Sequence, residues 1–285
     1  MLKVFIIGAG KAGKSLAALI AEKKVEVVGI YDVNETALKA AQKILAVRCY
    51  SKLNKATLKD ADIILVAVPD SVIGKTGKYL SEKKLITTTQ VVAHLSGSQP
   101  PSALRLKKGY CPALFHPLLS LADLSVARDE IKKAFIAIAG EAFAKRRLAL
   151  LARRLGATPV SLDEKNLPLY HSAATIVGNL PAALYLTAKK LFRDSGMKEM
   201  DAERAALTLL ASAAKNLVEK RFPDGLTGPI SRADAETIAR HIESLNESDK
   251  TSANIYRTLS RIILAELEKR KTLSKAELGR IKKLL

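Results

Sequence analysis

The sequence predicts an α/β fold, a doubly wound parallel sheet, followed by an all-helical domain. In residues 1–162, short runs rich in Val and Ile alternate with amphipathic helical patterns, which is typical of a parallel sheet covered on both faces. After residue 162 only long helical patterns follow. A length of 285 residues also suggests two domains, at roughly 150 residues per domain. We therefore expect a sheet domain over 1–162 and a helical domain over 163–285.

Eight apolar runs are the predicted strands of the first domain, and amphipathic patterns between them are the predicted helices. The strands are Leu2–Ile7, Val25–Tyr31, Val47–Cys49, Ile63–Val68, Val91–Leu95, Cys111–Phe115, Ala134–Ala139 and Thr158–Leu162. The clearest helices are Ala12–Lys23, Asn34–Ile44 and Glu141–Leu155. Gly156 follows the last of these, as a helix C-terminal glycine does.

The second domain begins with a long helical pattern from Asn166 to Ser195. Pro168 falls in its opening turn, where proline is favoured, and Pro181 should kink it. Serines followed three residues later by an acidic residue predict two helix starts, at Ser231 and Ser274. The further predicted helices are Asp201–Lys220, Arg232–Leu245, Asp249–Lys269 and Lys275–Leu284.

Composition restricts the classes of function. The net charge of +19 favours anionic ligands, but the lysines are spread along the chain and only 5% of residues are aromatic. We therefore expect no nucleic-acid partner, although an anion or nucleic-acid binder stays an alternative. Apolar runs are too short for a membrane span, and the N-terminus reads as a strand rather than a signal peptide. Cys49 and Cys111 lie far apart, so we expect no metal site and a reduced, cytoplasmic setting.

The segment Gly8-Ala9-Gly10-Lys11-Ala12-Gly13 is a G-x-G-x-x-G motif between a predicted strand and a predicted helix. This is the context that a Rossmann-type dinucleotide-binding turn requires. Gly8 permits the tight turn, Gly10 lets a pyrophosphate approach the backbone, and Gly13 lets the helix pack closely. The helix N-terminus then offers free N–H groups, including that of Ala12, and Lys11 adds positive charge. The motif predicts NAD or NADP as cofactor.

Asp32 ends the second predicted strand, where the adenosine ribose of a bound dinucleotide should lie. A carboxylate there accepts hydrogen bonds from a 2′-hydroxyl and repels a 2′-phosphate, at a cost of about 4 kcal/mol at ~4 Å. The positive charge of distant lysines is screened by salt over roughly 8 Å, so the nearby carboxylate has the larger effect on the 2′ position. NAD is therefore favoured over NADP. Alternatively, Asp32 caps the helix that begins near Asn34; both roles are compatible.

The carboxyl ends of later strands carry further candidates, because an open α/β sheet binds its ligands at that edge. Val68 and Pro69 follow the fourth predicted strand and are expected beside the cofactor. Ser96 follows the fifth, and His116 closes the sixth. For Ser96 and His116 a functional role and a structural role are equally favoured, whereas a structural role is favoured for His94.

On the long helix, His171, Thr175 and Asn179 occupy positions i, i+4 and i+8. This spacing places three polar groups on one face of an otherwise apolar helix. Because buried polar groups require partners, the face should line a ligand cleft or make hydrogen bonds between helices. We favour the cleft, shared with Ser96 and His116.

These motifs together resemble a known family. The segments G-A-G-K-A-G, A-V-P-D, H-L-S-G-S, F-H-P-L and the later L-T-G-P-I-S-R-A-D, followed by Thr237 and His241, resemble a two-domain bacterial family. That family pairs a Rossmann-like domain with a helical domain of unknown function. It is similar in architecture to pyrroline-5-carboxylate reductases, 6-phosphogluconate and β-hydroxyacid dehydrogenases, and deazaflavin-dependent NADP reductases. The resemblance implies NAD(P)-linked oxidoreduction and a 6-phosphogluconate-dehydrogenase-like helical domain that forms dimers.

The chain departs from its relatives at three places. Relatives often carry Ser-Arg after the second strand, which suits NADP, where this chain has Asp32-Val33. They usually read R-G-D where this chain has Ala233 between Arg232 and Asp234, which puts a tight backbone contact there in doubt. The long predicted helix Asn166–Ser195 also lacks the Lys-x-x-x-Asn pair of β-hydroxyacid dehydrogenases, so that activity is not assigned.

The sequence thus predicts hydride transfer between NAD(H) and a small carbonyl or imine substrate bound between the domains. His171 is the expected general acid or base, since an imidazole titrates near neutral pH. Asn179 and Ser96 are expected to orient the reacting atom beside His116. Thr175 and Arg232 are expected to bind substrate, Arg232 through a carboxylate. The alternative function for the whole chain is a non-catalytic NAD(H) sensor. The alternative for Arg232 is that it is an ordinary residue of the first turn of a helix. A homodimer through the apolar helices is expected.

Overall fold

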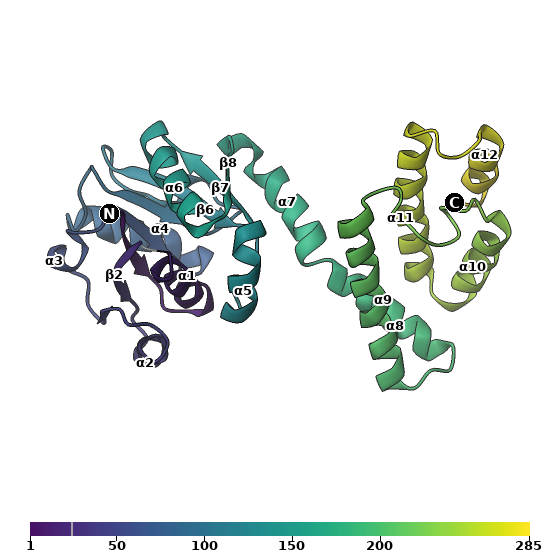
Figure 1. The fold of residues 1–285 in the computed structure, drawn as a ribbon, viewed down its shortest axis with the longest axis horizontal. Helices are drawn as coiled ribbons and strands as arrows, with labels where there is room; N and C mark the ends of the chain where they lie inside the picture. Colours follow the sequence, from purple (N-terminus) through teal and green to yellow (C-terminus); the bar gives the residue numbers. More distant parts are fainter. Residues whose placement is uncertain (24) are drawn as a thin grey trace. The chain divides into compact units, whose positions relative to one another are not determined.

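The computed structural model describes residues 1–23 and 25–285 (Figure 1). Its contacts divide the chain into two compact units, Met1–Val177 and Gly178–Leu285. The sheet unit is the first of these, and the helical unit is the second. The division falls later than residue 162 because the helix after the last strand begins with Leu167, a buried side chain that packs on the sheet.

Among the described residues, the sheet unit contains eight strands in the order β3-β2-β1-β4-β5-β6-β7-β8. Their bounds are β1 Lys3–Ile7, β2 Glu26–Tyr31, β3 Cys49–Tyr50, β4 Ile63–Val66, β5 Val91–His94, β6 Cys111–Pro117, β7 Phe135–Gly140 and β8 Thr158–Ser161. The first six strands are parallel and follow the order of the Rossmann fold. All eight predicted strands are therefore confirmed, with shifts of one or two residues at most ends.

The predicted parallel sheet is confirmed for β1–β6, whereas β7 and β8 run in the opposite direction. β7 runs antiparallel to β6, with Phe115 opposite Ile138, and β8 then runs parallel to β7. The connection from β6 passes through α5 (Leu124–Glu130), and β7 begins at the same end of the sheet at which β6 stops. A parallel neighbour would instead require a crossover to the opposite edge. Apolar runs predict strands but do not encode the direction in which a chain re-enters its sheet.

Helices cover both faces of the sheet (Figure 1). One face packs on α1 (Lys11–Ala21), α2 (Glu35–Gln42), α5 and α6 (Ala142–Leu155). The other packs on α3 (Lys55–Leu58), α4 (Asp70–Glu82) and the short helix η1 (Pro101–Leu104). Because side chains alternate along a strand, Ile6 of β1 enters the first core and Phe5 the second, both fully buried. This double burial explains the uninterrupted apolar runs.

The predicted long helix Asn166–Ser195 is two helices. α7 spans Leu167–Gly178, and α8 spans Pro181–Asp194. Pro181 is the first residue of α8 rather than a kink inside one helix. Proline lacks an N–H group, which is unneeded at a helix start, and its ring obstructs a helix that continues through it.

The helical unit continues with α9 (Glu199–Lys220), α10 (Ala235–Ser248), α11 (Lys250–Lys269) and α12 (Lys275–Leu284). Its core lies among α10, α11 and α12, around Ile238, Leu264 and Ile281. Within the described chain, α8 has no fully buried residue, and α9 buries only two alanines, Ala202 and Ala206.

One of the two predicted helix starts is confirmed. Ser274 and Glu277 form a capping box at the start of α12. The other prediction is wrong: α10 begins at Ala235, and Asp234 caps it by accepting a hydrogen bond from the Thr237 N–H. The Ser231 hydroxyl instead donates to the Gly228 carbonyl of the preceding turn.

No helix in residues 1–23 and 25–285 has the length and apolar character needed to cross a membrane.

Candidate functional site

The turn between β1 and α1 depends on glycine at two of its three motif positions. Gly8 has φ +110°, and a Cβ there would lie 2.3 Å from the Ala67 carbonyl oxygen. A Cβ at Gly13 would lie 1.9 Å from the Gly8 carbonyl oxygen. A Cβ at Gly10 would meet no described atom within 4 Å. Gly8 and Gly13 are therefore required by the fold, whereas Gly10 leaves open space beside the backbone.

The open space at Gly10 adjoins the N-terminus of α1. Gly10 is the N-cap of α1, and no described side chain bonds its first-turn N–H groups. These free donors and the helix dipole favour an anion. Lys11, the first residue of α1, is exposed, and Ala12 is half-buried. The geometry is that of a phosphate-binding turn.

Asp32 follows β2 and faces the glycine turn. Its Oδ2 accepts a hydrogen bond from the Ala9 N–H at 2.6 Å, and its Oδ1 accepts one from the Asn34 N–H at 2.8 Å. Asn34, not Asp32, caps α2 by accepting from the Thr36 and Ala37 N–H groups. The alternative role of Asp32 as the helix cap is therefore wrong, and its carboxylate lies beside the motif.

A pocket of about 310 Å³ opens between the glycine turn and α4. It is lined by Ile7, Gly8, Tyr31, Asp32, Val33, Leu53, Val68, Val72, Lys75, Thr76 and Tyr79. Of the residues predicted from the sequence, Gly8, Asp32 and Val68 line this pocket, and Pro69 is the N-cap of α4. Sequence reasoning missed the contribution of α4, although Val72, Thr76 and Tyr79 are spaced as one helical face after a strand end.

His94, at the end of β5, has a structural role. Its side chain is fully buried, with Nε2 3.0 Å from the Pro100 carbonyl oxygen. Nδ1 accepts a hydrogen bond from the Ser96 N–H at 3.2 Å, so Nε2 carries the proton and donates. Burial lowers the pKa of His94. Both ring nitrogens are occupied in holding the loop after β5.

That loop carries two serines that converge on one carboxylate. The Ser96 hydroxyl donates to Oδ2 of Asp70 at 2.8 Å, and the Ser98 hydroxyl donates to the same oxygen at 3.3 Å. Asp70 is the first residue of α4. Ser98 and Asp70 were not among the predicted site residues, although the A-V-P-D and S-G-S segments place both at strand ends.

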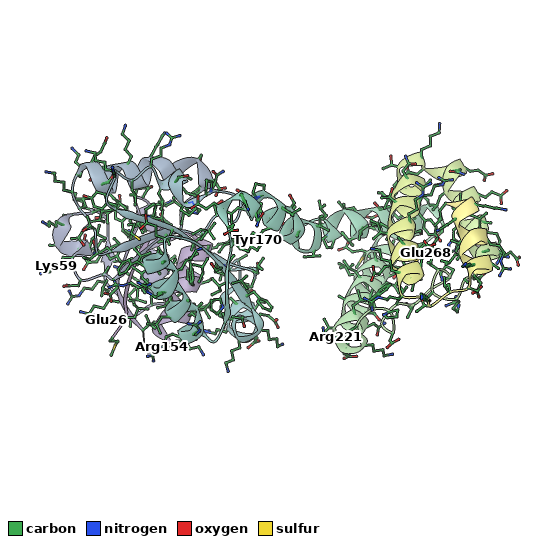
Figure 2. The ribbon with its side chains drawn as sticks, turned by 90° about the horizontal axis from the view of Figure 1, so that it is seen from above. Glu26, Lys59, Arg154, Tyr170, Arg221 and Glu268 are labelled. Atoms are coloured by element: carbon green, nitrogen blue, oxygen red, sulfur yellow. The ribbon has the colours of Figure 1, made fainter. Side chains whose placement is uncertain are left out.

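His116 of β6 bonds a residue that sequence reasoning missed. Its Nδ1 lies 2.7 Å from the hydroxyl oxygen of Tyr170 on α7, the residue labelled in Figure 2. Burial, the neighbouring His171 and His94 lower the pKa of His116 to about 4, which Asp70 partly opposes. Burial raises the pKa of Tyr170 to about 12. Both groups are therefore neutral near pH 7. The position of Tyr170, directly before His171, is the signal that could have found it.

His171 stands against His116, with their ring centroids 6.0 Å apart and the rings inclined at 72°. Its Nδ1 is buried and has no hydrogen-bond partner among the described residues. A Cβ at Gly97 would lie 2.6 Å from Cε1 of His116 and 2.8 Å from Nδ1 of His171. Glycine at position 97 therefore permits both imidazoles to approach the β5 loop. We call Ser96, Gly97, His116, Tyr170 and His171 the histidine cluster.

The structure thus brings together three of the predicted residues, Ser96, His116 and His171, at one edge of the sheet unit. Thr175 is half-buried, one turn after His171 on α7. Asn179 lies in the turn after α7 and is exposed, so the predicted three-residue helical face ends at Thr175. Asn179 and the exposed Arg232 belong to the helical unit.

In the part of the chain that the structure describes, no group of three or more His, Cys, Asp or Glu side chains could hold a metal ion.

Two family models match the chain. Residues 1–117 match a Rossmann-like domain, and residues 134–263 match a domain of unknown function, DUF2520. The chain therefore combines a Rossmann-like domain with a DUF2520 domain. The DUF2520 match begins at residue 134 and therefore includes β7 and β8, whereas the contacts divide the chain after Val177. The boundary expected after residue 162 lies between these two positions.

One curated relative is the glycerol-3-phosphate dehydrogenase [NAD(P)+] of Clostridium botulinum, 28% identical over 145 residues. The match covers 47% of this chain and 43% of that enzyme, so it spans less than half of either. The chain resembles NAD(P)-dependent dehydrogenases and reductases.

Solved structures share the fold. A Thermotoga maritima protein matches with a TM-score of 0.75 at 19% identity, over 94% of this chain and 99% of its own. A ketol-acid reductoisomerase from an uncultured archaeon matches at 0.67 and 10% identity, over 100% and 95%. A 1-pyrroline-5-carboxylate reductase from Streptococcus pyogenes matches at 0.62 and 16% identity, over 95% and 99%. The sheet followed by helices is thus an architecture that reductases use.

Proposed function

We propose that this protein is an NAD-dependent oxidoreductase that transfers hydride to or from a small carbonyl or imine substrate. The observation that carries the proposal is the position of His171. A buried, unpartnered ring nitrogen is costly in a folded protein. It occurs here at the carboxyl edge of a Rossmann-type sheet, where such sheets bind their ligands, beside a second histidine and a serine loop.

The glycine turn and its pocket supply a route for the dinucleotide. The free N–H groups of α1 would bind the pyrophosphate, and the pocket between Val33 and Val72 would hold the adenosine. The opposite end would then extend along the strand ends past Pro69 toward Ser96. The nicotinamide would supply or accept hydride there.

The pocket supports a preference for NAD over NADP. Asp32 lies beside the glycine turn, where its carboxylate would accept a hydrogen bond from the ribose 2′-hydroxyl and repel a 2′-phosphate. Lys75 lines the same pocket from α4 and favours a phosphate. The carboxylate dominates because each of its two oxygens accepts a hydrogen bond from a backbone N–H group, whereas Lys75 is an exposed, flexible side chain.

The two histidines would divide the proton chemistry. With its pKa held near 4, His116 is uncharged near pH 7 and bonded to Tyr170, which suits it to orienting a substrate oxygen or nitrogen. His171 has an uncommitted nitrogen and would give or take the proton. Ser96 would hydrogen-bond the reacting atom, and Thr175 would extend the same face of α7.

Cofactor titration and turnover test this proposal. NADH should bind more tightly than NADPH by fluorescence titration, and Asp32→Ser should narrow or reverse the difference. Asn34→Ser, which retains a helix-capping side chain, is the matched control and should leave the ratio unchanged. NADH should then be consumed with some member of a panel of keto acids and cyclic imines. Equal affinities for the two cofactors would refute the NAD preference, and tight NADH binding without any turnover would favour a sensor.

We further propose that the protein works as a homodimer joined through the helical unit. Leu186 of α8 and Leu209 of α9 are each 60% exposed, and Ile262 of α11 is 63% exposed. A second copy that covers these helices would bury this apolar surface, and two-fold pairing is the commonest arrangement. Light scattering should show a dimer, and L186E/L209E should yield a monomer. Val126→Glu, an exposed apolar position of the sheet unit, should stay dimeric. A monomeric wild-type protein at micromolar concentration would refute this.

A further inference from the structure

A second hollow in the sheet unit lies along α6 and the edge strand β8, with a volume of about 450 Å³. Its lining residues are Ile138, Lys145, Arg146, Ala149, Arg153, Pro159 and Ser161. Three of these carry a positive charge, and none is acidic. No function described above uses this hollow.

The helix α6 places its cations around the hollow by spacing. Lys145, Ala149 and Arg153 are at i, i+4 and i+8, and Arg146 lies within one turn of Ala149. The small side chain of Ala149 between the cations leaves the floor of the hollow open. Ser161 contributes a hydroxyl from the end of β8, and Ile138 and Pro159 form an apolar wall.

These cations are uncompensated, unlike others on the same unit. Among the described residues, none of Lys145, Arg146 and Arg153 forms an ion pair. In contrast, Arg147 on the same helix pairs with Asp62 at 3.1 Å, and Arg128 pairs with Glu22 at 2.7 Å. Three like charges that line one concavity repel one another, and an anion placed among them would relieve that repulsion.

We propose that this hollow binds the phosphate group of a small phosphomonoester. Two guanidinium groups offer paired donors that match phosphate oxygens, and an ammonium and a hydroxyl complete a set suited to a dianion. The volume falls in the range of small-molecule sites, and the apolar wall suits the organic part of the ligand. A nucleic-acid backbone is less suited, since no aromatic side chain lines the hollow for base stacking.

The hollow is separate from the dinucleotide pocket. That pocket is lined from β1, β2 and the residues after β4, whereas the hollow is lined from β7 and β8. Strands β5 and β6 lie between these two parts of the sheet. Both sites can therefore be occupied at once.

Calorimetry with inorganic phosphate tests the proposal on the full-length protein. Ionic strength is kept constant with sodium chloride, and titrations are run with and without excess NADH, which competes for any phosphate at the glycine turn. Phosphate should bind in both conditions. The variant R146Q/R153Q, which removes two charge-assisted contacts from exposed positions, should weaken phosphate binding more than about tenfold. The variant K107Q/K108Q removes the same charge from exposed lysines outside the hollow and should change it less than about twofold.

Three results would overturn the proposal. Phosphate could fail to bind, or both double variants could weaken it equally, which would indicate a general effect of net charge. A DNA duplex could bind in a manner that R146Q/R153Q abolishes while phosphate does not compete, which would indicate a polymer ligand instead. Thermal unfolding of each variant verifies that the fold is retained, and the comparison of the two variants does not depend on whether NADH binds.

Discussion

The sheet unit and the helical unit bury their residues differently. The central strands of the sheet unit are covered on both faces, and side chains such as Phe5, Ile6 and Phe115 are fully buried. In the helical unit, α10–α12 share one core, but α8 and α9 leave Leu186 and Leu209 mostly exposed. The sheet unit therefore completes its own core, whereas part of the helical unit leaves apolar side chains exposed, and these are the ones that the proposed dimer would cover.

The residues of the proposed chemistry and those of the proposed dimer contact also fall in different units. The glycine turn, the pocket beside it and the histidine cluster all belong to residues 1–177. A rigid, doubly covered sheet can hold an unpartnered imidazole nitrogen in place, at a cost that its core offsets. Variants in the two units should consequently change different measured quantities.

The largest effect is expected for His171→Ala. If this imidazole transfers the proton, its loss should lower turnover by about 10²–10⁴-fold, while NADH affinity changes less than about twofold. Steady-state rates with the best substrate of the panel and fluorescence titration separate the two quantities. Ser172→Ala, at the next residue on α7, whose hydroxyl donates to the Pro168 carbonyl, is the control and should retain full activity. A His171→Ala enzyme with normal turnover would place the chemistry elsewhere.

Acid should destabilise the sheet unit first. The pKa of His116 is near 4 in the folded state and 6.5 in the unfolded state, so the unfolded chain binds the additional proton. Stability is then complete above about pH 6.5 and falls as the pH approaches 4, by as much as about 3 kcal/mol. His94, whose pKa is also lowered, adds to the same window.

Urea unfolding at several pH values measures this. His116→Gln should flatten the decline between pH 6.5 and 4 relative to the wild type. His241→Gln, at an exposed position of the helical unit, should leave it unchanged. An identical pH dependence in wild type and His116→Gln would contradict a depressed pKa at this site.

Alanine at either of two glycines of the same turn should weaken NADH binding, but only one of the two variants should lose stability. In Gly13→Ala the new Cβ meets the Gly8 carbonyl, so stability should fall by about 1–3 kcal/mol and NADH binding should weaken as the turn shifts. In Gly10→Ala the Cβ meets no described protein atom, so the melting temperature should hold while NADH binding weakens. Thermal unfolding and NADH titration of both variants are needed. A Gly10→Ala protein with unchanged NADH affinity would show that the turn binds no pyrophosphate.

The turn could be predicted from the sequence because its requirements are local. Three glycines, a preceding apolar strand and a following helix fix the backbone within one continuous segment of the chain. Asp32 could be predicted for the same reason, since it directly follows β2, the strand that comes after α1 and pairs with β1. The histidine cluster is different, because it joins β5, β6 and α7, and Tyr170 bonds a partner 54 residues away. Sequence spacing indicated strand ends, but which side chains meet there depends on the register of the sheet.

The ends of the helices show the same limit of prediction from sequence spacing. The box at Ser274 was predictable because both partners lie within one turn. Around Ser231 the same spacing is present, yet the Ser231 hydroxyl bonds Gly228 and the helix begins later. Asn179 was predicted on the face of His171 because proline was expected to bend a helix, whereas at Pro181 one helix has ended and another begins.

The smallest effect is expected at Ala233, in the turn before α10. Ala233 has φ +54°, the left-handed conformation that glycine adopts without strain. Relief of this strain outweighs the larger entropy of glycine in the unfolded state and the loss of a half-buried methyl group. Ala233→Gly should therefore raise the free energy of unfolding by about 0.5 kcal/mol.

Ala235→Gly, in the first turn of α10, makes the same change where the backbone is helical, and should lower the free energy of unfolding by about 0.5–1 kcal/mol. Urea unfolding of the two variants side by side should give shifts of opposite sign, and a loss of stability in both would show that Ala233 is not strained.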